Sequence, residues 1–248
     1  MNLSGNTILI TGGATGIGLD LAKEFLRRGN TVLTCGRREA KLAEAREAAP
    51  GLQTRVCDIA NSNDRKSLAD WAISSGVNIL INNAGMQREI DFTRGMDAIE
   101  EGDDEIEINL RGTIYLTAQL IPHLMQQKNA SILNVTSGLG FVPLAIMPIY
   151  CATKAAMHSF TLSLRHQLKP TGVKVVEIIP GVVDTELDRG ARAKRGMTFR
   201  GVTVQQVTEE VMRGLEVDAH EIPIGTAAGL MAESRANFDY VFGRMNNR

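Results

Sequence analysis

Short apolar runs alternate along the chain with segments in which apolar residues recur every three or four positions. Residues 7–10 form such a run, and glycines crowd residues 12–18. Beyond them, Ile17, Leu21 and Phe25 recur every four positions. A short apolar run is typical of a buried strand, and four-residue spacing is typical of one face of a helix. The chain is therefore expected to open with a strand, a glycine turn and a helix.

The same two patterns predict the remaining elements. Strands are expected at residues 31–35, 53–57, 77–81, 131–135, 173–179 and 221–224. Helices are expected at residues 39–49, 62–75, 104–127, 149–168 and 203–215. Almost continuously apolar strands separated by helices predict a parallel sheet covered on both faces. We therefore expect an α/β fold with three α/β/α layers, in which residues 1–248 form a single-domain, doubly wound parallel sheet of the Rossmann type.

Two stretches lack a regular pattern, and both follow predicted strands. They are residues 86–103 and 184–202. Doubly wound sheets bind ligands at the carboxyl ends of their strands, where these stretches lie. We expect residues 186–202 to cover the substrate. Basic residues in that loop either attract an anionic substrate or keep the loop solvated, and we favour solvation for Arg189, Arg192, Lys194, Arg195 and Arg200.

Composition and charge narrow the class of protein. Lys and Arg number 27 against 28 Asp and Glu, giving a net charge of -1, which does not favour nucleic acid or a membrane surface as partner. No apolar run approaches the roughly 20 residues that span a bilayer, and the first residues lack the basic region of a signal peptide. Cys35, Cys57 and Cys151 form no C-x-x-C pair, as is typical of a reduced cytosolic protein. We expect a cytoplasmic protein without a metal site, because no metal-ligand spacing such as H-E-x-x-H occurs.

A glycine-rich turn between the first predicted strand and helix is a candidate phosphate site. Glycines permit a tight turn and a close approach of backbone N–H groups, and the helix N-terminus adds a positive dipole end. The spacing G-x-x-x-G-x-G differs from the G-x-G-x-x-G of many dehydrogenases. The alternative is that these glycines only form a turn and bind no phosphate. Their position between a strand and a helix argues against that alternative. The residues predicted to contact a pyrophosphate are Gly12, Thr15, Gly16, Ile17 and Gly18.

The end of the second predicted strand indicates which nicotinamide dinucleotide fits. An Asp or Glu there would accept hydrogen bonds from the adenosine ribose and repel a 2′-phosphate. Gly36 occupies that place, and Arg37 and Arg38 follow, whose planar guanidiniums bind phosphate. A solvated helix start is the alternative, but we favour NADP(H), with NAD(H) as the second choice. Asp58, at the end of the third strand, is either a partner of the adenine amino group or a plain loop carboxylate.

Tyr150 and Lys154 are the candidate catalytic pair. They lie four residues apart at the start of a predicted helix, so both side chains share one face. A free phenol has a pKa of about 10, and an adjacent ammonium favours its phenolate. The phenol can donate a proton to a carbonyl oxygen as hydride arrives, or take it back in oxidation. Pairs at this spacing also arise by chance, so the surrounding residues decide the interpretation.

Polar or small residues end the other predicted strands at the same edge. Ser137 follows the strand at 131–135 and is a candidate for holding the substrate oxygen. Asn109 lies inside a predicted helix although Asn is a mediocre helix former, which points to a special role. Two further strand ends supply candidate cofactor contacts: Asn83, Ala84, Gly85, Pro180, Gly181, Val183 and Thr185.

Taken in order, these motifs resemble those of the classical short-chain dehydrogenases/reductases from about residue 5 to about residue 225. The resemblance implies that Tyr150 is the catalytic acid/base and that Ser137 orients the substrate carbonyl. It implies that Lys154 holds the nicotinamide ribose and lowers the pKa of the phenol. It also implies that Asn109 anchors a water linking this lysine to solvent.

The resemblance extends to the cofactor and to assembly. It implies that the backbone near Val183 and the side chain of Thr185 meet the nicotinamide amide, and that Arg37 stands where NADP-preferring members carry a basic residue. A homodimer or homotetramer is expected by the same analogy. Two departures stand out, since neither Ala14 nor Thr15 is basic and the chain after residue 225 matches no general motif of the family.

Four functions are compatible with these motifs. We favour hydride transfer between NADP(H) and a carbonyl or secondary alcohol. A catalytically idle NADP-binding regulatory or redox-sensing protein would not need the complete acid/base set. Epimerases and dehydratases of nucleotide-sugars are a further class, but such enzymes resemble longer chains with a substrate domain after the last strand. The resemblance also admits a specialised role associated with cell-wall D-alanylation.

Apolar residues beside the candidate catalytic pair predict the kind of substrate. A mostly apolar lining favours a small or medium apolar ketone, aldehyde or secondary alcohol. The expected lining residues are Met86, Gln87, Leu139, Phe141, Met147, Pro148 and Val182. His158 and His166 lie two turns apart in the helix of Tyr150, and we expect them to be packing or interface residues.

Overall fold

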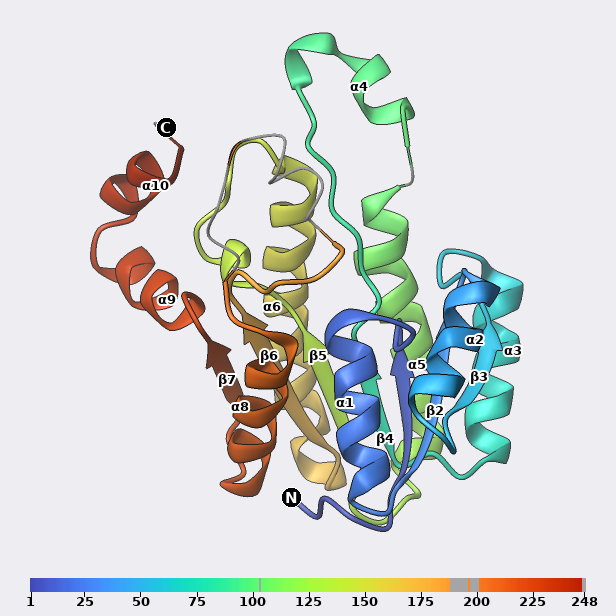
Figure 1. The fold of residues 1–248 in the computed structure, drawn as a ribbon. Helices are drawn as coiled ribbons and strands as arrows, with labels where there is room; N and C mark the ends of the chain where they lie inside the picture. Colours follow the sequence, from blue (N-terminus) through green and yellow to red (C-terminus); the bar gives the residue numbers. More distant parts are fainter. Residues whose placement is uncertain (103, 188–195, 197–200, 247–248) are drawn as a thin grey trace.

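The computed structural model describes residues 1–102, 104–187, 196 and 201–246, and in this part of the chain seven parallel strands form one sheet (Figure 1). The strand order is β3-β2-β1-β4-β5-β6-β7. The strands are β1 (Thr7–Thr11), β2 (Thr31–Gly36), β3 (Gln53–Val56), β4 (Ile79–Asn82), β5 (Ser131–Val135), β6 (Lys174–Pro180) and β7 (Glu221–Ile224). This order confirms the doubly wound α/β fold predicted from the sequence.

Helices cover both faces of the sheet, which explains why its strands are apolar throughout. Ile8 and Ile10 of β1 belong to one hydrophobic core and Leu9 belongs to the other, because successive side chains of a strand point to opposite faces. One core lies beneath α1 (Gly16–Arg27), α2 (Glu39–Ala48) and α8 (Val204–Glu216). The other lies beneath α3 (Ser62–Ser74), α5 (Thr113–Leu124) and α6 (Pro148–Leu168).

The strand order reverses between β1 and β4. From β1 the chain proceeds outward to β2 and β3 and then returns to place β4 on the other side of β1. The connections that leave the carboxyl ends of β1 and β4 therefore diverge. A crevice at such a switch point is where doubly wound sheets bind ligands.

The helix predicted at 104–127 begins differently from an ordinary α-helix. Residues Glu107–Gly112 form η2, a π-helix, and α5 continues from it. Gly112 packs so closely on the loop after β3 that a Cβ there would lie 2.5 Å from the carbonyl oxygen of Ile59. The apolar periodicity of the sequence does not distinguish this wide turn from an α-helical one, so the prediction was wrong in this detail.

The described part of the irregular stretch, residues 86–102, forms an arm that rises above the sheet (Figure 1). It contains two short helices, η1 (Phe92–Arg94) and α4 (Met96–Glu100). The guanidinium of Arg88 donates to the carbonyl oxygens of Ala98 at 2.9 Å and Ile99 at 3.1 Å, which holds the arm folded on its own base.

Two helices that the sequence patterns did not reveal follow β7. They are α9 (Ala227–Ala236) and α10 (Phe238–Asn246), and they lie beyond the β7 edge of the sheet, at the other end from β3 and α3 (Figure 1). The side chain of Asn246 accepts from the backbone N–H of Ala145 at 2.6 Å and donates to the carbonyl oxygen of Pro143 at 3.1 Å. Helix α10 is thus attached to the loop that precedes α6.

Two short helical turns lie in the connections that follow β5 and α6, namely η3 (Gly138–Gly140) and η4 (Lys169–Thr171). Within the described ranges, no helix combines the length and the apolar character needed to cross a bilayer. Most of the predicted substrate-covering loop 186–202 falls outside the described residues. Its basic side chains lie there too: Arg189, Arg192, Lys194, Arg195 and Arg200.

Candidate active site

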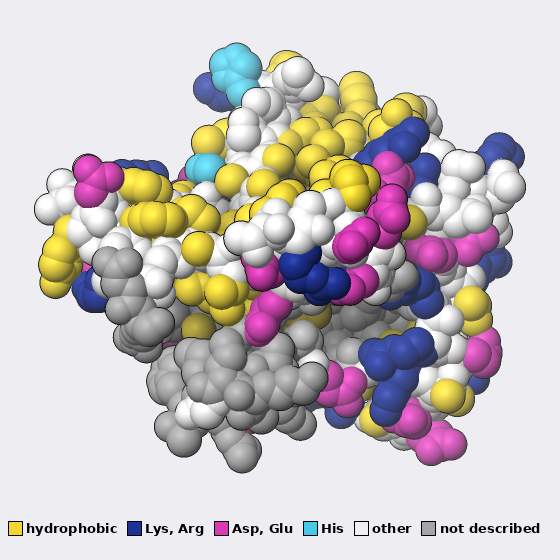
Figure 2. Space-filling model, turned by 90° about the horizontal axis from the view of Figure 1, so that it is seen from above, with side chains coloured by type: hydrophobic (Ala, Val, Ile, Leu, Met, Phe, Trp, Pro, Cys, Tyr) yellow, Lys and Arg dark blue, Asp and Glu magenta, His cyan; other side chains and the backbone are white. Residues whose placement is uncertain are grey.

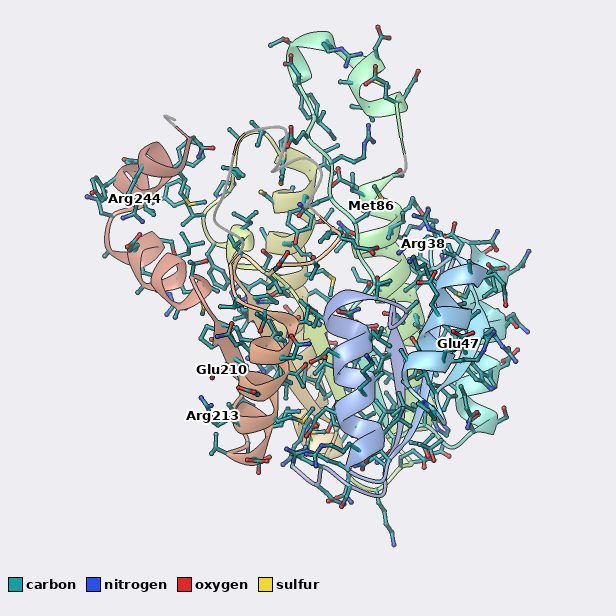
Figure 3. The ribbon with its side chains drawn as sticks, in the orientation of Figure 1. Arg38, Glu47, Met86, Glu210, Arg213 and Arg244 are labelled. Carbon is teal, nitrogen blue, oxygen red and sulfur yellow. The ribbon has the colours of Figure 1, made fainter. Side chains whose placement is uncertain are left out.

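A cleft of about 960 Å³ lies along the carboxyl ends of the strands. Arg38 lies near one end of this edge and Arg244 near the other, with Met86 between them (Figure 3). Seen from above, this end of the molecule shows a broad hydrophobic patch with acidic and basic side chains interspersed at its borders (Figure 2). The cleft therefore offers both apolar and charged surface to a ligand.

Almost all of the predicted site residues line this one cleft. They are Gly12, Thr15, Gly16, Ile17, Arg37, Arg38, Asp58, Asn83, Ala84, Gly85, Ser137, Tyr150, Lys154, Pro180, Gly181, Val183 and Thr185. The two exceptions, Gly18 and Asn109, lie behind its wall and support residues that do line it.

The glycine turn after β1 is packed against the end of β4. Gly12 has a φ of +67°, and a Cβ there would lie 2.8 Å from the Cα of Ala84. A Cβ at Gly18 would lie 2.5 Å from Nδ2 of Asn83. That amide donates to the carbonyl oxygens of Thr11 at 3.0 Å and Gly12 at 3.1 Å. The side chain of Asn83, predicted as a cofactor contact, thus holds the turn in place.

The N-terminus of α1 faces the cleft without a side-chain cap. Thr15 is its N-cap residue and makes no capping hydrogen bond, so the first N–H groups of this helix lack the usual side-chain acceptor. Across the cleft, Thr185 approaches Gly16, where a Cβ would lie 3.4 Å from Cγ2 of Thr185. An anion between these walls would meet the positive end of the helix dipole.

The end of β2 places two guanidiniums at one end of the cleft. Arg37 and Arg38 are both exposed, and Arg38 lies 3.8 Å from the carboxylate of Glu186, which belongs to the opposite wall. Asp58 lies nearby after β3, and its Oδ1 accepts from the backbone N–H of Ala60 at 3.0 Å. The basic side chains and this carboxylate therefore share one end of the cleft.

Tyr150 and Lys154 lie in the first two turns of α6, and both are buried. Their exposed fractions are 7% and 6%. The Nζ of Lys154 lies 5.6 Å from the centroid of the Tyr150 ring and donates to the carbonyl oxygen of Val135 at 2.9 Å. Burial lowers the pKa of Lys154 to about 8, because removal from water disfavours the ammonium form.

Asn109 is buried in η2 and holds the chain that leaves β4. Its Oδ1 accepts from the backbone N–H of Met86 and its Nδ2 donates to the carbonyl oxygen of Met86, both at 2.8 Å. Nδ2 also lies 3.2 Å from Oγ1 of Thr153, the neighbour of Lys154. A Cβ at Gly85 would lie 3.3 Å from Oδ1 of Asn109 and 3.7 Å from Nζ of Lys154, so both groups converge there.

Ser137 follows β5 in an extended conformation and begins the turn η3. Its Oγ accepts from the backbone N–H of Leu139 at 3.1 Å, and the side chain is almost fully buried at the wall of the cleft. Because the oxygen of Ser137 is an acceptor in this bond, its proton remains to be donated to another group.

Apolar residues make up the part of the cleft beside Tyr150, and the sequence predicted this lining only in part. Met86, Gln87, Leu139, Met147 and Val182 line it as expected. Phe141 and Pro148 are not among the lining residues, which corrects the prediction. Phe141 packs instead on Ile179, Ala227 and Met231, and Pro148 occupies the first turn of α6.

The sequence analysis missed the contribution of α9 and α10 to this apolar end. Leu230 of α9 and Met245 and Asn246 of α10 line the cleft, as does Arg244, which forms an ion pair with Glu233. A helical pattern in the tail was the signal that could have found them, since α10 has a clear apolar face centred on buried Val241.

Comparison with known proteins identifies the family. A protein-family model described as short chain dehydrogenase matches residues 6–196 of this chain. The chain is 46% identical over 250 residues to the uncharacterized oxidoreductase DltE of Bacillus subtilis (strain 168), covering 100% of this chain and 99% of that protein.

Solved structures give the same result. A short chain dehydrogenase from Burkholderia cenocepacia J2315, in complex with NADP, is 27% identical with a TM-score of 0.82 over 99% of both chains. A short-chain dehydrogenase from Sphingobium yanoikuyae, in complex with NADPH, is 27% identical with a TM-score of 0.79 over 95% of both chains. The family expected from the sequence motifs is thereby confirmed: the chain belongs to the short-chain dehydrogenase family of oxidoreductases.

Proposed function

We propose that this protein transfers a hydride between NADP(H) and a small or medium apolar carbonyl compound or secondary alcohol. The observation that carries the proposal is the convergence of Ser137, Tyr150 and Lys154 on one cleft, beside an apolar lining. Asn109 lies behind the wall of the cleft and is hydrogen-bonded to the backbone of Met86, which lines it. This set supplies a proton donor, a hydrogen-bond donor and a cation next to the space where a substrate fits.

The turn after β1 fits the pyrophosphate of a nicotinamide dinucleotide. Gly12 and Gly18 leave no room for a Cβ, which brings backbone against backbone, and the N-terminus of α1 lacks a side-chain cap. Arg37 and Arg38 would bind the 2′-phosphate, and Asp58 the adenine. Similar dehydrogenases and reductases hold NADP, NADPH or NADH, so they support a nicotinamide dinucleotide in general, and the preference for NADP(H) rests on Arg37 and Arg38.

The side chains of this chain would divide the chemistry as follows. NADPH, when bound, supplies the hydride. The hydroxyl of Ser137 donates a hydrogen bond to the substrate oxygen, which Tyr150 protonates. Lys154 is an ammonium below its pKa of about 8, and its positive charge favours the phenolate that Tyr150 leaves behind. In oxidation the same proton returns to Tyr150.

Turnover of a carbonyl panel tests the proposal. We expect oxidation of NADPH, followed by the absorbance of its reduced nicotinamide, and a loss of about 10²–10⁴-fold in kcat for Tyr150→Phe with NADPH affinity retained. Tyr115→Phe is the matched control, because Tyr115 is exposed on α5 and does not line the cleft. NADPH binding without turnover of any carbonyl or alcohol would favour an idle redox-sensing protein instead.

We also propose a cytoplasmic homodimer or homotetramer. The exposed face of α6 carries small and apolar side chains, among them Ala152, Ala155 and Leu162, which support close contact with a second copy. The three cysteines are free thiols, as a reducing compartment favours. A single mass equal to one chain in light scattering would refute the assembly.

A further inference from the structure

A row of buried polar side chains crosses the sheet just beneath the cleft. Asn82 of β4, Asn134 of β5 and Glu177 of β6 are direct neighbours in the strand register. Asn82 donates to Asn134 at 2.8 Å and to Oγ1 of Thr117 at 3.0 Å, and Asn134 donates to Oγ1 of Thr161 at 2.9 Å. The row therefore faces α5 and α6, the side of the sheet on which Tyr150 and Lys154 also lie.

Glu177 is the charged member of this row. Its side chain has an exposed fraction of 0%. The hydroxyl of Thr136 donates to its Oε1 at 2.7 Å, and Nδ1 of His158 lies 2.8 Å from Oε2 and 3.1 Å from Oε1. A carboxylate only accepts hydrogen bonds, so the Nδ1 of His158 carries the donating proton. Burying a carboxylate inside the sheet is costly unless it is paired, which indicates that this cluster has a role beyond filling the core.

Both partners of Glu177 belong to the structures that carry the candidate active site. Thr136 immediately precedes Ser137 in the sequence, and its hydrogen bond to Glu177 fixes the end of β5. His158 lies one turn after Lys154 in α6, on the same helix face. The cluster therefore connects the strand that presents Ser137 with the helix that presents Tyr150 and Lys154.

The far end of the turn that begins at Ser137 rests on the same helix. The ring of Phe141 packs on the imidazole of His158, with 4.5 Å between centroids. Gly140 lies so close to α6 that a Cβ there would be 3.0 Å from the carbonyl carbon and oxygen of Lys154. The turn is therefore fixed at both ends, by Thr136 before Ser137 and by Phe141 after it.

We propose that Glu177 and His158 are positioning residues that set the location of the Ser137 hydroxyl relative to Tyr150, acting through Thr136 and Phe141. The inference rests on the proposed function, since it supposes that Ser137 holds the substrate oxygen. Neither Glu177 nor His158 lines the cleft, so they act on Ser137, which does, through Thr136 and Phe141.

A double-mutant cycle tests this role. Thr136→Val keeps the shape of the side chain and removes its hydroxyl, and we expect kcat with NADPH and a carbonyl to fall about tenfold while KM for NADPH changes less than about twofold. In a Ser137→Ala background the same substitution should have no further effect on kcat. Independent, multiplying losses would overturn the proposal, because they would mean that Thr136 does not act through Ser137.

Substitutions of Glu177 distinguish the effect of losing its hydrogen bond with Thr136 from a general loss of protein stability. Glu177→Gln retains an acceptor for Thr136 and should keep most of the kcat, whereas Glu177→Val should lose about as much as Thr136→Val. Thr117→Val is the matched control, because it removes a hydroxyl from the other end of the same row. Wild-type kcat for Glu177→Val would overturn the proposal.

Hydrogen exchange provides a measurement that does not depend on turnover. In Glu177→Val the backbone amides of Leu139, Gly140 and Phe141 should exchange at least about tenfold faster than in the wild type, and in Thr117→Val they should not. Unchanged exchange in Glu177→Val would overturn the positioning role. An absence of turnover in the wild type would refute the proposed function alone, and exchange would still decide whether the cluster fixes the turn.

Discussion

The ammonium of Lys154 donates to the carbonyl oxygen of Val135 at 2.9 Å, a contact that joins the first turns of α6 to the end of β5. Burial lowers the pKa of this lysine from its usual 10.5 to about 8. A shift of that size corresponds to about 3 kcal/mol against the charged form in the folded protein. The residue that completes the candidate site therefore works against the stability of the fold.

Replacing Lys154 by Met should stabilise the protein at pH 7 while abolishing turnover. The cost of the buried ammonium is fully present below pH 8 and is relieved as the pH rises toward 10.5, because the folded protein loses this proton while the unfolded chain keeps it. Against this gain stands the lost hydrogen bond to Val135, worth about 1 kcal/mol. We expect a net gain of about 1–2 kcal/mol in urea unfolding at pH 7, shrinking toward pH 10. A difference that does not change with pH would contradict this account.

Replacing Arg37 by Ala should weaken NADPH far more than NADH. If its guanidinium binds the 2′-phosphate, removal of a charge-assisted, bidentate contact should raise the Kd for NADPH at least about tenfold. The Kd for NADH, which lacks that phosphate, should change less than about twofold. Lys66→Ala is a suitable control, because Lys66 is an exposed basic residue of α3 that does not line the cleft. Equal losses for both dinucleotides in fluorescence titration would remove Arg37 from the phosphate site.

Replacing Gly18 by Ala should disrupt dinucleotide binding although Gly18 does not line the cleft. A Cβ there would lie 2.5 Å from Nδ2 of Asn83 and 2.7 Å from the carbonyl oxygen of Gly12, so the glycine turn must shift. We expect a loss of at least about tenfold in affinity for NADPH by calorimetry. Gly229→Ala is the matched control, since a Cβ at that helical position would have no atom within 4 Å other than its chain neighbours and its own helix backbone. Full affinity in Gly18→Ala would show that the turn is not what binds the cofactor.

Replacing Asn246 by Ala should change substrate binding more than chemistry. This side chain ties α10 to the backbone of Pro143 and Ala145, in the loop that brings Ile146 and Met147 to the apolar end of the cleft. Without it we expect KM for an apolar carbonyl to rise about three- to tenfold, with kcat and NADPH affinity changed less than about twofold, because loss of one hydrogen bond is worth about 1 kcal/mol. A fall in kcat at constant KM would instead assign α10 to the chemistry.

The strands, the covering helices and the glycine turn were predictable because each is set by neighbours in the sequence. The placement of Tyr150 and Lys154 at the cleft, and of Arg37 and Arg38 at its end, was predictable for the same reason, since helix spacing and strand ends fix their direction. The fixing of Ser137 was not predictable, because Glu177 lies 41 residues from Thr136 and only the sheet register brings them together. Phe141 was misplaced because its packing partners lie on β6 and α9. The contribution of α10 was missed because Asn246 binds the backbone of Pro143 and Ala145, which lie 103 and 101 residues earlier in the chain.

The π-helix η2 gives the molecule an unusual sensitivity to length. Wide turns of this kind behave as one extra residue within an α-helix and are frequently found at functional sites. Deleting one residue between 107 and 112 would let ordinary helical geometry run through while α5 kept its packing, but the side chains of the wide turn would lose their present directions. The local backbone would become more regular, yet Asn109 would turn away from Met86. At this position a more regular helix would disrupt the wall of the candidate active site that Asn109 supports.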